Sequence, residues 1–325
     1  MAGLPENNCL LVAITTPVTP DFRPDPSRLL ARARHLMGEG CDGVTLFGTT
    51  GEGAEFAAED RMAALDFLIA GGIDPARVIV SAGALSIADV VRLSRHAIAA
   101  GVHGLLVMPP CVYRGGITEE GTFRYYCAVI DQTARSDMRL YLYHFPDICG
   151  VPITPQVARR LDERYEGMIA GIKDSGGDLD FTQDLIRRFS HLSIFTGTEM
   201  HLPEVLATGA RGTICGLANV MPRLMRVMLD MPSAFARRTV LPLLMSGDTI
   251  LSRRPFIPSV KAIVAETLGD SGWRRLVPPM FEIGAIERRR MVDDFLAWDH
   301  SLPANWSSFA RPEMPSAKVI GLRRA

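Results

Sequence analysis

"GMIAGIKDSGGD", residues 167–178, is a short apolar run that ends on a lysine and then breaks into glycines. Such a run is typical of a strand buried on both faces of a parallel sheet. The terminal Lys173 either extends its ammonium group to water along an apolar stem, or lies in a dry site where desolvation lowers the pKa of the amine and makes it a nucleophile. The rest of the sequence distinguishes between these two interpretations of Lys173.

Seven further apolar runs of this kind lie along the first two thirds of the chain: 9–15, 43–48, 77–83, 104–109, 139–144, 192–197 and 212–217. Segments with helical periodicity stand between them, among them 26–40, 57–72, 86–101 and 118–135. Buried strands that alternate with helices indicate a parallel sheet covered by helices. Eight such units predict an α/β fold of the (β/α)8 (TIM) barrel type, with a doubly wound open sheet as the alternative.

Beyond residue 230 the pattern is helical only. We therefore expect a barrel over residues 1–230, a C-terminal helical appendage over 231–301, and an extended tail over 302–325, where prolines occur without periodicity.

Composition narrows the class of protein. The 325 residues include 35 basic and 36 acidic side chains, which gives no electrostatic footprint for nucleic acid. No uncharged apolar stretch is long enough for a membrane span, and no basic leader precedes the first apolar run. The six cysteines lie far apart, as expected of buried thiols in a reducing compartment. The chain is expected to be cytoplasmic, with no nucleic-acid or membrane partner.

The chemistry of a barrel lies where its strands end. The second run ends in Thr49 and Thr50, the fifth in Tyr143 and the sixth in Lys173. An imine between Lys173 and a 2-oxo acid would place a cationic electron sink beside the bond that breaks or forms. The threonine turn offers N–H groups and hydroxyls to the substrate carboxylate, and the Tyr143 phenol can transfer protons. Together these groups indicate that Lys173 is catalytic.

The motifs "GTTGEG" followed by "FAAEDR", "LYHFP" and "GIKDSGG" resemble the dihydrodipicolinate synthase / N-acetylneuraminate lyase superfamily of class I aldolases, in register from about residue 10 to 230 and again at "IPSVKAIVAE". The resemblance implies a homotetrameric barrel that acts on pyruvate or a longer 2-oxo acid through a lysine Schiff base, without metal. It also implies that Thr50 relays a proton to solvent. The candidate substrate-binding residues are Thr49, Thr50, Gly51, Ser175, Gly197, Glu199 and Ile214.

Several side chains have more than one interpretation. Tyr141 points to the same face as Tyr143, and it is the family register that selects Tyr143. We expect Glu52 to cap the following helix, and His144, on the opposite face from Tyr143, to pack or make a supporting contact. The histidines form no ligand spacing, so neither a metal nor a cofactor is expected.

Departures from the family limit the choice of reaction. Ile148 stands where the synthases carry an arginine, which argues against the lysine-biosynthetic reaction, whereas Gly150 and Ser175 match the lyases. Cys111 stands where the family has a tyrosine lent to the neighbouring subunit, and Tyr113 could replace it only if the loop is shifted. We expect reversible cleavage of a 2-oxo-4-hydroxy acid to pyruvate and an aldehyde. Dehydration of a 2-oxo-3-deoxy sugar acid, the synthase reaction and a non-catalytic 2-oxo acid-binding barrel are the alternatives.

Overall fold

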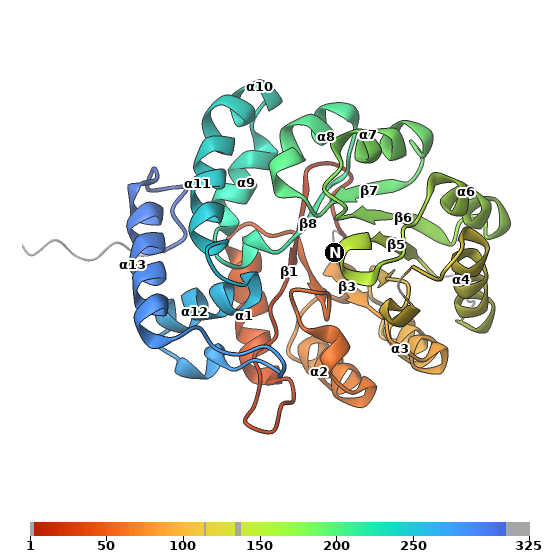
Figure 1. Ribbon diagram of the computed structural model, residues 1–325, viewed down its shortest axis with the longest axis horizontal. Coiled ribbons are helices and arrows are strands. Elements are labelled where there is room, and N and C mark those ends of the chain that lie inside the picture. Colours follow the sequence, from red (N-terminus) through yellow and green to blue (C-terminus); the bar gives the residue numbers. More distant parts are fainter. Residues whose placement is uncertain (1–2, 114, 134–137, 310–325) are drawn as a thin grey trace, which may run out of the picture.

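The computed structural model describes residues 3–113, 115–133 and 138–309 (Figure 1). Eight parallel strands follow one another around a closed barrel, and β1 pairs with β8. The strands are β1 Cys9–Ala13, β2 Gly43–Leu46, β3 Val78–Ser81, β4 Gly104–Val107, β5 Leu140–His144, β6 Ile169–Asp174, β7 Ser193–Thr196 and β8 Gly212–Cys215. The predicted TIM barrel is confirmed, and closure through β1 and β8 excludes the open sheet.

Helices surround the barrel in a ring (Figure 1). They are α1 Pro26–Gly38, α2 Ala58–Ala70, α3 Ile87–Ala99, α4 Glu119–Thr133, α5 Pro146–Cys149, α6 Pro155–Arg164, α7 Leu179–Arg188, α8 Leu202–Thr208 and α9 Pro222–Asp230. Asp25 and Thr154 each accept a hydrogen bond at the start of α1 and α6, and proline occupies the first turn of both helices. Among the described helices, none combines the length and apolar character needed to cross a membrane.

Strand side chains alternate between two cores. Leu11, Tyr141, Tyr143, Phe195 and Ile214 fill the barrel interior. Their neighbours along the strands face outward and pack against the helices in a larger cluster. This alternation makes the barrel a filled core, so its chemistry is confined to the loops at the strand ends.

The C-terminal region continues from α9 as helices: α10 Ser233–Phe235, a π-helical turn Ala236–Val240, α11 Leu241–Leu251, α12 Phe256–Thr267 and α13 Ala285–Ser301. Of these, α11 and the π-helical turn contact α9, and Arg28 of α1 forms an ion pair with Asp270, which follows α12. Leu244, Val260 and Phe295 belong to the same buried cluster as the outer face of the barrel. Of the expected tail, residues 310–325 lie outside the described residues.

Candidate active site

The paired strands β5 and β6 place Tyr143 directly beside Lys173. The Lys173 ammonium group donates to the Tyr143 hydroxyl at 3.1 Å and lies 4.3 Å from the centre of its ring. Both side chains are buried, with 5% and 2% of their surface exposed. The structure thus brings the predicted nucleophile and the predicted proton-transfer group within hydrogen-bonding distance.

The turn after β2 supplies the next polar group. The hydroxyls of Thr49 and Tyr143 lie 3.3 Å apart, which extends the polar chain to Lys173–Tyr143–Thr49. The turn is tight, because Phe47 and Glu52 both adopt left-handed backbone conformations, with φ of 59° and 53°. Only glycine fits at Gly53, where a Cβ would stand 1.8 Å from the carbonyl oxygen of Phe47.

Gly51 and Thr50 occupy the centre of this turn. The N–H of Gly51 donates to the carbonyl of Gly48 at 3.0 Å, and its own carbonyl accepts from the buried hydroxyl of Thr16 at 2.7 Å. The hydroxyl of Thr50 lies toward the end of β8, 3.2 Å from the point where a Cβ on Gly216 would stand. Thr16, which the sequence did not single out, fixes the turn to the end of β1.

The expected capping role of Glu52 is wrong. Its side chain caps no helix; it forms an ion pair with Lys261 of α12, and both side chains are fully buried. The N–H of Val277 donates to the second carboxylate oxygen at 3.1 Å, and Lys261 donates to the carbonyl of Arg275 at 2.9 Å. Burial raises the pKa of Glu52, and the positive charge of Lys261 opposes this change. The turn after β2 is therefore tied to the C-terminal helices.

The predicted binding residues that follow β6 and β7 also meet at this end of the barrel. A Cβ on Gly197 would stand 2.0 Å from the Ser175 hydroxyl and 3.0 Å from Cε of Lys173, so these three residues are in close contact. Glu199 accepts from the N–H groups of Gly216 and Leu217 at 3.1 and 3.2 Å. One Glu199 carboxylate oxygen thus holds the turn after β8. Burial raises the pKa of Glu199, an effect opposed by hydrogen bonds from the N–H groups of Glu199 itself and of Leu217 and by the Lys173 charge.

Tyr141 precedes Tyr143 on β5 and lies deeper in the barrel interior, to which Ile214 also belongs. Ile214 is fully buried, in the same interior cluster as Tyr143. Tyr141 is also fully buried, and its hydroxyl lies 3.1 Å from the ring of His103, which precedes β4. The Tyr141 phenol is thus directed to the opposite end of the barrel from Lys173.

His144 faces outward, as strand alternation predicts. Its ring stacks on Phe181 of α7 at 4.6 Å, and its Nδ1 accepts from the N–H of Ile153 at 3.0 Å. Burial lowers the pKa of His144. These contacts give His144 a packing role behind the strand.

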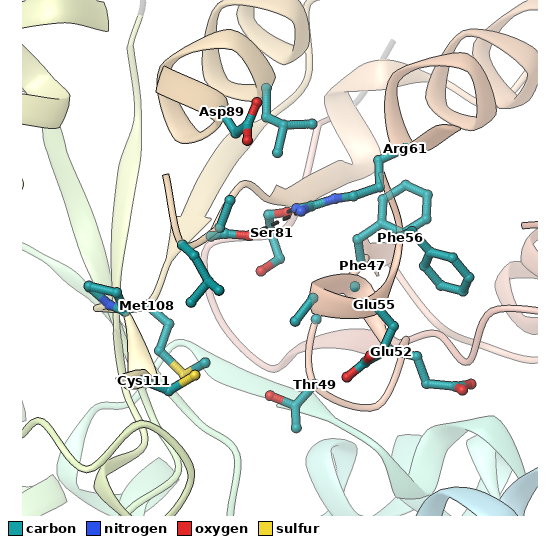
Figure 2. A pocket seen from close by; sticks show the side chains of 18 of the residues that line it. Phe47, Thr49, Glu52, Glu55, Phe56, Arg61, Ser81, Asp89, Met108 and Cys111 are labelled. Atoms are coloured by element: carbon teal, nitrogen blue, oxygen red, sulfur yellow. Dashed lines mark hydrogen bonds between the residues drawn. The ribbon is translucent and has the colours of Figure 1, made fainter. Parts of the chain in front are cut away.

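Tyr143 and Thr49 line a cavity of about 570 Å³. Figure 2 shows the cavity with Thr49 at its edge. Its wall also includes Met108, Cys111 and Ile148, whereas Lys173 lies behind the Tyr143 hydroxyl and does not line the cavity. Nothing in the sequence pattern pointed to this cavity, because its wall is assembled from loops far apart along the chain.

Two expectations concern groups beyond this core. In the described part of the chain, no three His, Cys, Asp or Glu side chains are grouped in a way that could hold a metal ion. Tyr113 lies in the 3₁₀ turn Cys111–Tyr113, but its side chain lies outside what the structure describes. That Tyr113 replaces the family's tyrosine through a shifted loop stays untested.

The profile of the Dihydrodipicolinate synthetase family matches residues 6–285. The chain belongs to this family. The chain is a carbon–carbon lyase of the class I aldolase type. Lys173 and Tyr143 lie close enough together for the imine chemistry that the sequence motifs imply. The resemblance found in the sequence motifs is confirmed.

Individual relatives and solved structures resemble the chain over most of its length. The chain is 36% identical over 222 residues to an uncharacterized DapA-like lyase of Chloroflexus aurantiacus, across 68% of this chain and 73% of that one. The dihydrodipicolinate synthase of Agrobacterium tumefaciens superposes with a TM-score of 0.81 and 31% identity, covering 89% of this chain and 99% of that one. A variant of 2-keto-3-deoxygluconate aldolase from Sulfolobus solfataricus shares the fold, with a TM-score of 0.80 and 22% identity over 91% and 97% of the two chains.

Proposed function

We propose that this lyase reversibly cleaves a 2-oxo-4-hydroxy acid to pyruvate and an aldehyde. The observation that carries the proposal is the contact of 3.1 Å between the Lys173 amine and the Tyr143 hydroxyl at the carboxyl end of the barrel. An amine beside a phenol in a buried site supplies both the nucleophile and the proton carrier that an imine mechanism needs.

In this mechanism the Lys173 amine attacks C2 of the substrate, and water leaves to give the imine. Tyr143 then takes the proton of the C4 hydroxyl while the C3–C4 bond breaks. The aldehyde departs, and the electron pair moves into the imine to form an enamine. Protonation at C3 and hydrolysis release pyruvate and the free lysine. Thr50 would exchange the Tyr143 proton with solvent, and the Thr49–Gly51 turn would bind the carboxylate.

Borohydride reduction in the presence of pyruvate tests the nucleophile. We expect an irreversible adduct on the peptide that contains "GIKDSGG", and none in a Lys173→Met variant. An adduct on another lysine, with Lys173 unmodified, would refute the assignment. Product analysis on candidate 2-oxo acids then separates two reactions: aldol cleavage releases equal amounts of pyruvate and aldehyde, whereas a dehydratase releases water and no pyruvate.

The synthase reaction of some relatives is a poorer match. Ile148 provides no charge-assisted hydrogen bonds for the carboxylate of an amino-acid semialdehyde, which an arginine at this place would provide. We therefore expect weak condensation of pyruvate with aspartate semialdehyde. Efficient turnover of this pair by the purified protein would contradict the proposal.

The assembly and location of the protein remain part of the proposal. The family resemblance implies a homotetramer, and the net charge and dispersed cysteines suit a cytoplasmic protein. Light scattering coupled to gel filtration would measure the mass in solution, and a mass below that of four chains would contradict the tetramer.

A further inference from the structure

The cavity beside Tyr143 is lined mainly by apolar side chains. They come from separate parts of the chain: Phe47 and Phe56 around the turn after β2, Met108 after β4, Ile148 on α5, and Met280 in the loop before α13. Figure 2 shows Met108 on one side of the space and Phe47 and Phe56 on the other. A volume of about 570 Å³ is within the range of small-molecule sites, roughly 300–1,000 Å³.

The positively charged side chain on the cavity wall, Arg61, already donates hydrogen bonds to the backbone. Among the described lining residues Arg61 carries the only positive charge, and it donates to the carbonyl of Gly83 at 3.0 Å and to the carbonyl of Ser81. Its guanidinium also lies 5.6 Å from the centre of the Phe47 ring, as Figure 2 shows from the side. Arg61 holds the end of β3, so it is not directed at a ligand.

The remaining charges on the wall are negative. Glu52 pairs with Lys261, and Asp89 pairs with Arg92 at 3.0 Å, while Glu55 is exposed. A carboxylate or phosphate that entered the cavity would lose water without gaining a positively charged partner there, and it would face Glu55. An uncharged apolar group would gain free energy in proportion to the area that it buries.

The cavity also lies where the leaving half of the substrate must be. Tyr143 lines it, and the hydroxyl of Tyr143 is 3.1 Å from the amine that would carry the pyruvyl half. The carbinol carbon of a substrate bound to Lys173 would be near this hydroxyl, so the chain beyond that carbon would extend past Tyr143 and Thr49.

We infer that the cavity binds the aldehyde half of the substrate, and that the enzyme favours uncharged aldehydes with an apolar body, such as an aromatic ring, over aldehydes that carry a carboxylate or a phosphate. This inference rests on the proposed aldol function. In the synthetic direction the enamine of pyruvate adds through C3 to the aldehyde carbon. The aldehyde oxygen takes a proton from Tyr143, and water releases the 4-hydroxy-2-oxo acid from the lysine.

The test compares three aldehydes in condensation with pyruvate: benzaldehyde, succinic semialdehyde and glyceraldehyde 3-phosphate. We expect kcat/KM for benzaldehyde to exceed that for either anion by about 100-fold or more, because an unpaired charge is costly to desolvate. Ile148→Arg should lower kcat/KM for benzaldehyde and raise it for succinic semialdehyde, each by about 10-fold. Ile286→Arg is the matched control: Ile286 is 72% exposed on α13 and does not line the cavity.

Two outcomes would overturn the inference: a charged aldehyde that reacts as well as benzaldehyde, or the same selectivity in Ile148→Arg and Ile286→Arg. Borohydride trapping of pyruvate is run on the same samples. Trapping on Lys173 together with a preference for charged aldehydes, or with no condensation at all, refutes the apolar aldehyde site alone. Absence of trapping on Lys173 refutes the proposed function as well.

Discussion

Tyr143 and Tyr141 lie on the same face of β5 but reach different layers of the barrel. Tyr143 contacts Lys173 and Thr49, whereas Tyr141 contacts His103. Strand alternation places both side chains inside and cannot rank them. The ranking depends on which hydroxyl meets the lysine, and this depends on the register between β5 and β6, which a single sequence does not contain.

We expect Tyr143→Phe to fold normally, since only a hydroxyl is removed from a ring that still packs. Turnover should fall by roughly 10²–10⁴-fold, the usual range for the loss of one positioned proton-transfer group. Tyr141→Phe is the matched control and should change the rate far less. Steady-state pyruvate release by both variants measures this, and a larger loss in Tyr141→Phe would show that the catalytic tyrosine is misassigned.

His103 makes stability depend on pH. Burial lowers its pKa from 6.5 to about 4, with smaller contributions from the charges of Arg139 and Arg211. Between these two pH values the unfolded chain binds a proton that the folded chain does not. Stability is therefore lost as the pH falls through this window.

His103→Gln should reduce the loss of stability between pH 6.5 and pH 4, although His35 and His144, whose pKa values burial also lowers, continue to contribute. Urea unfolding at several pH values measures the change. His191→Gln, at a side chain that is 60% exposed, serves as the control. If His103→Gln and wild type lose the same free energy over this window, the protonation of His103 is not the cause.

At the scale of elements, the turn after β2 depends on a helix that lies far from it in the sequence. Glu52 and Lys261 are 209 positions apart, and both are fully buried. The turn itself was predicted correctly, since "GTTGEG" is a local pattern. The ion pair that anchors the turn was not predicted. A helix cap explains a glutamate at position 52 from its local sequence alone, whereas its partner Lys261 is remote. The signal that could have found the anchor is Lys261, a charge inside the apolar run "IPSVKAIVA".

Removal of either partner should be costly. Glu52→Gln leaves the Lys261 ammonium group buried without its counter-charge. Lys261→Met likewise leaves the Glu52 carboxylate buried without a positive partner. Each change should lower the free energy of unfolding by about 3–5 kcal/mol. Because the turn holds Thr49 and Thr50, we also expect KM for the 2-oxo acid to rise.

The double variant Glu52→Gln/Lys261→Met is the control for this pair, because it removes both charges. It should be more stable than the sum of the single changes predicts, with a coupling of at least about 1 kcal/mol in a double-mutant cycle. Additive effects on stability, with KM unchanged, would show that the ion pair neither stabilises the fold nor positions the turn.

For the whole molecule, the near-continuous apolar strands were sufficient to predict the barrel, because a parallel sheet has to be covered on both faces. The cavity could not be predicted in this way. Met108, Ile148 and Met280 come together through the closure of the barrel and the return of the C-terminal loop. Their spacing in the sequence carries no signal of this contact.

The imine mechanism proposed for Lys173 predicts that turnover needs no metal. The imine on Lys173 is itself the electron sink, so a Lewis acid is not required to stabilise the enamine. Dialysis against excess EDTA should leave the rate of pyruvate release unchanged. A loss of activity that zinc or magnesium restores would contradict this, and zinc or magnesium added to an undialysed sample controls for inhibition.

The barrel and the C-terminal helices differ in pattern, yet we predict that they form one folding unit. Leu244, Val260 and Phe295 are buried in the same cluster as the outer barrel, and Lys261 neutralises Glu52 in the turn after β2. A chain that ends at Asp230 would expose this apolar surface and leave a buried carboxylate without its partner.

We expect residues 1–230 expressed alone to be insoluble, or to retain helical circular dichroism without a cooperative melt. Co-expression with residues 231–325 as a second chain is the matched experiment, and it should restore soluble protein and pyruvate trapping on Lys173. A soluble 1–230 chain that melts cooperatively and traps pyruvate would show instead that the C-terminal helices are an independent addition.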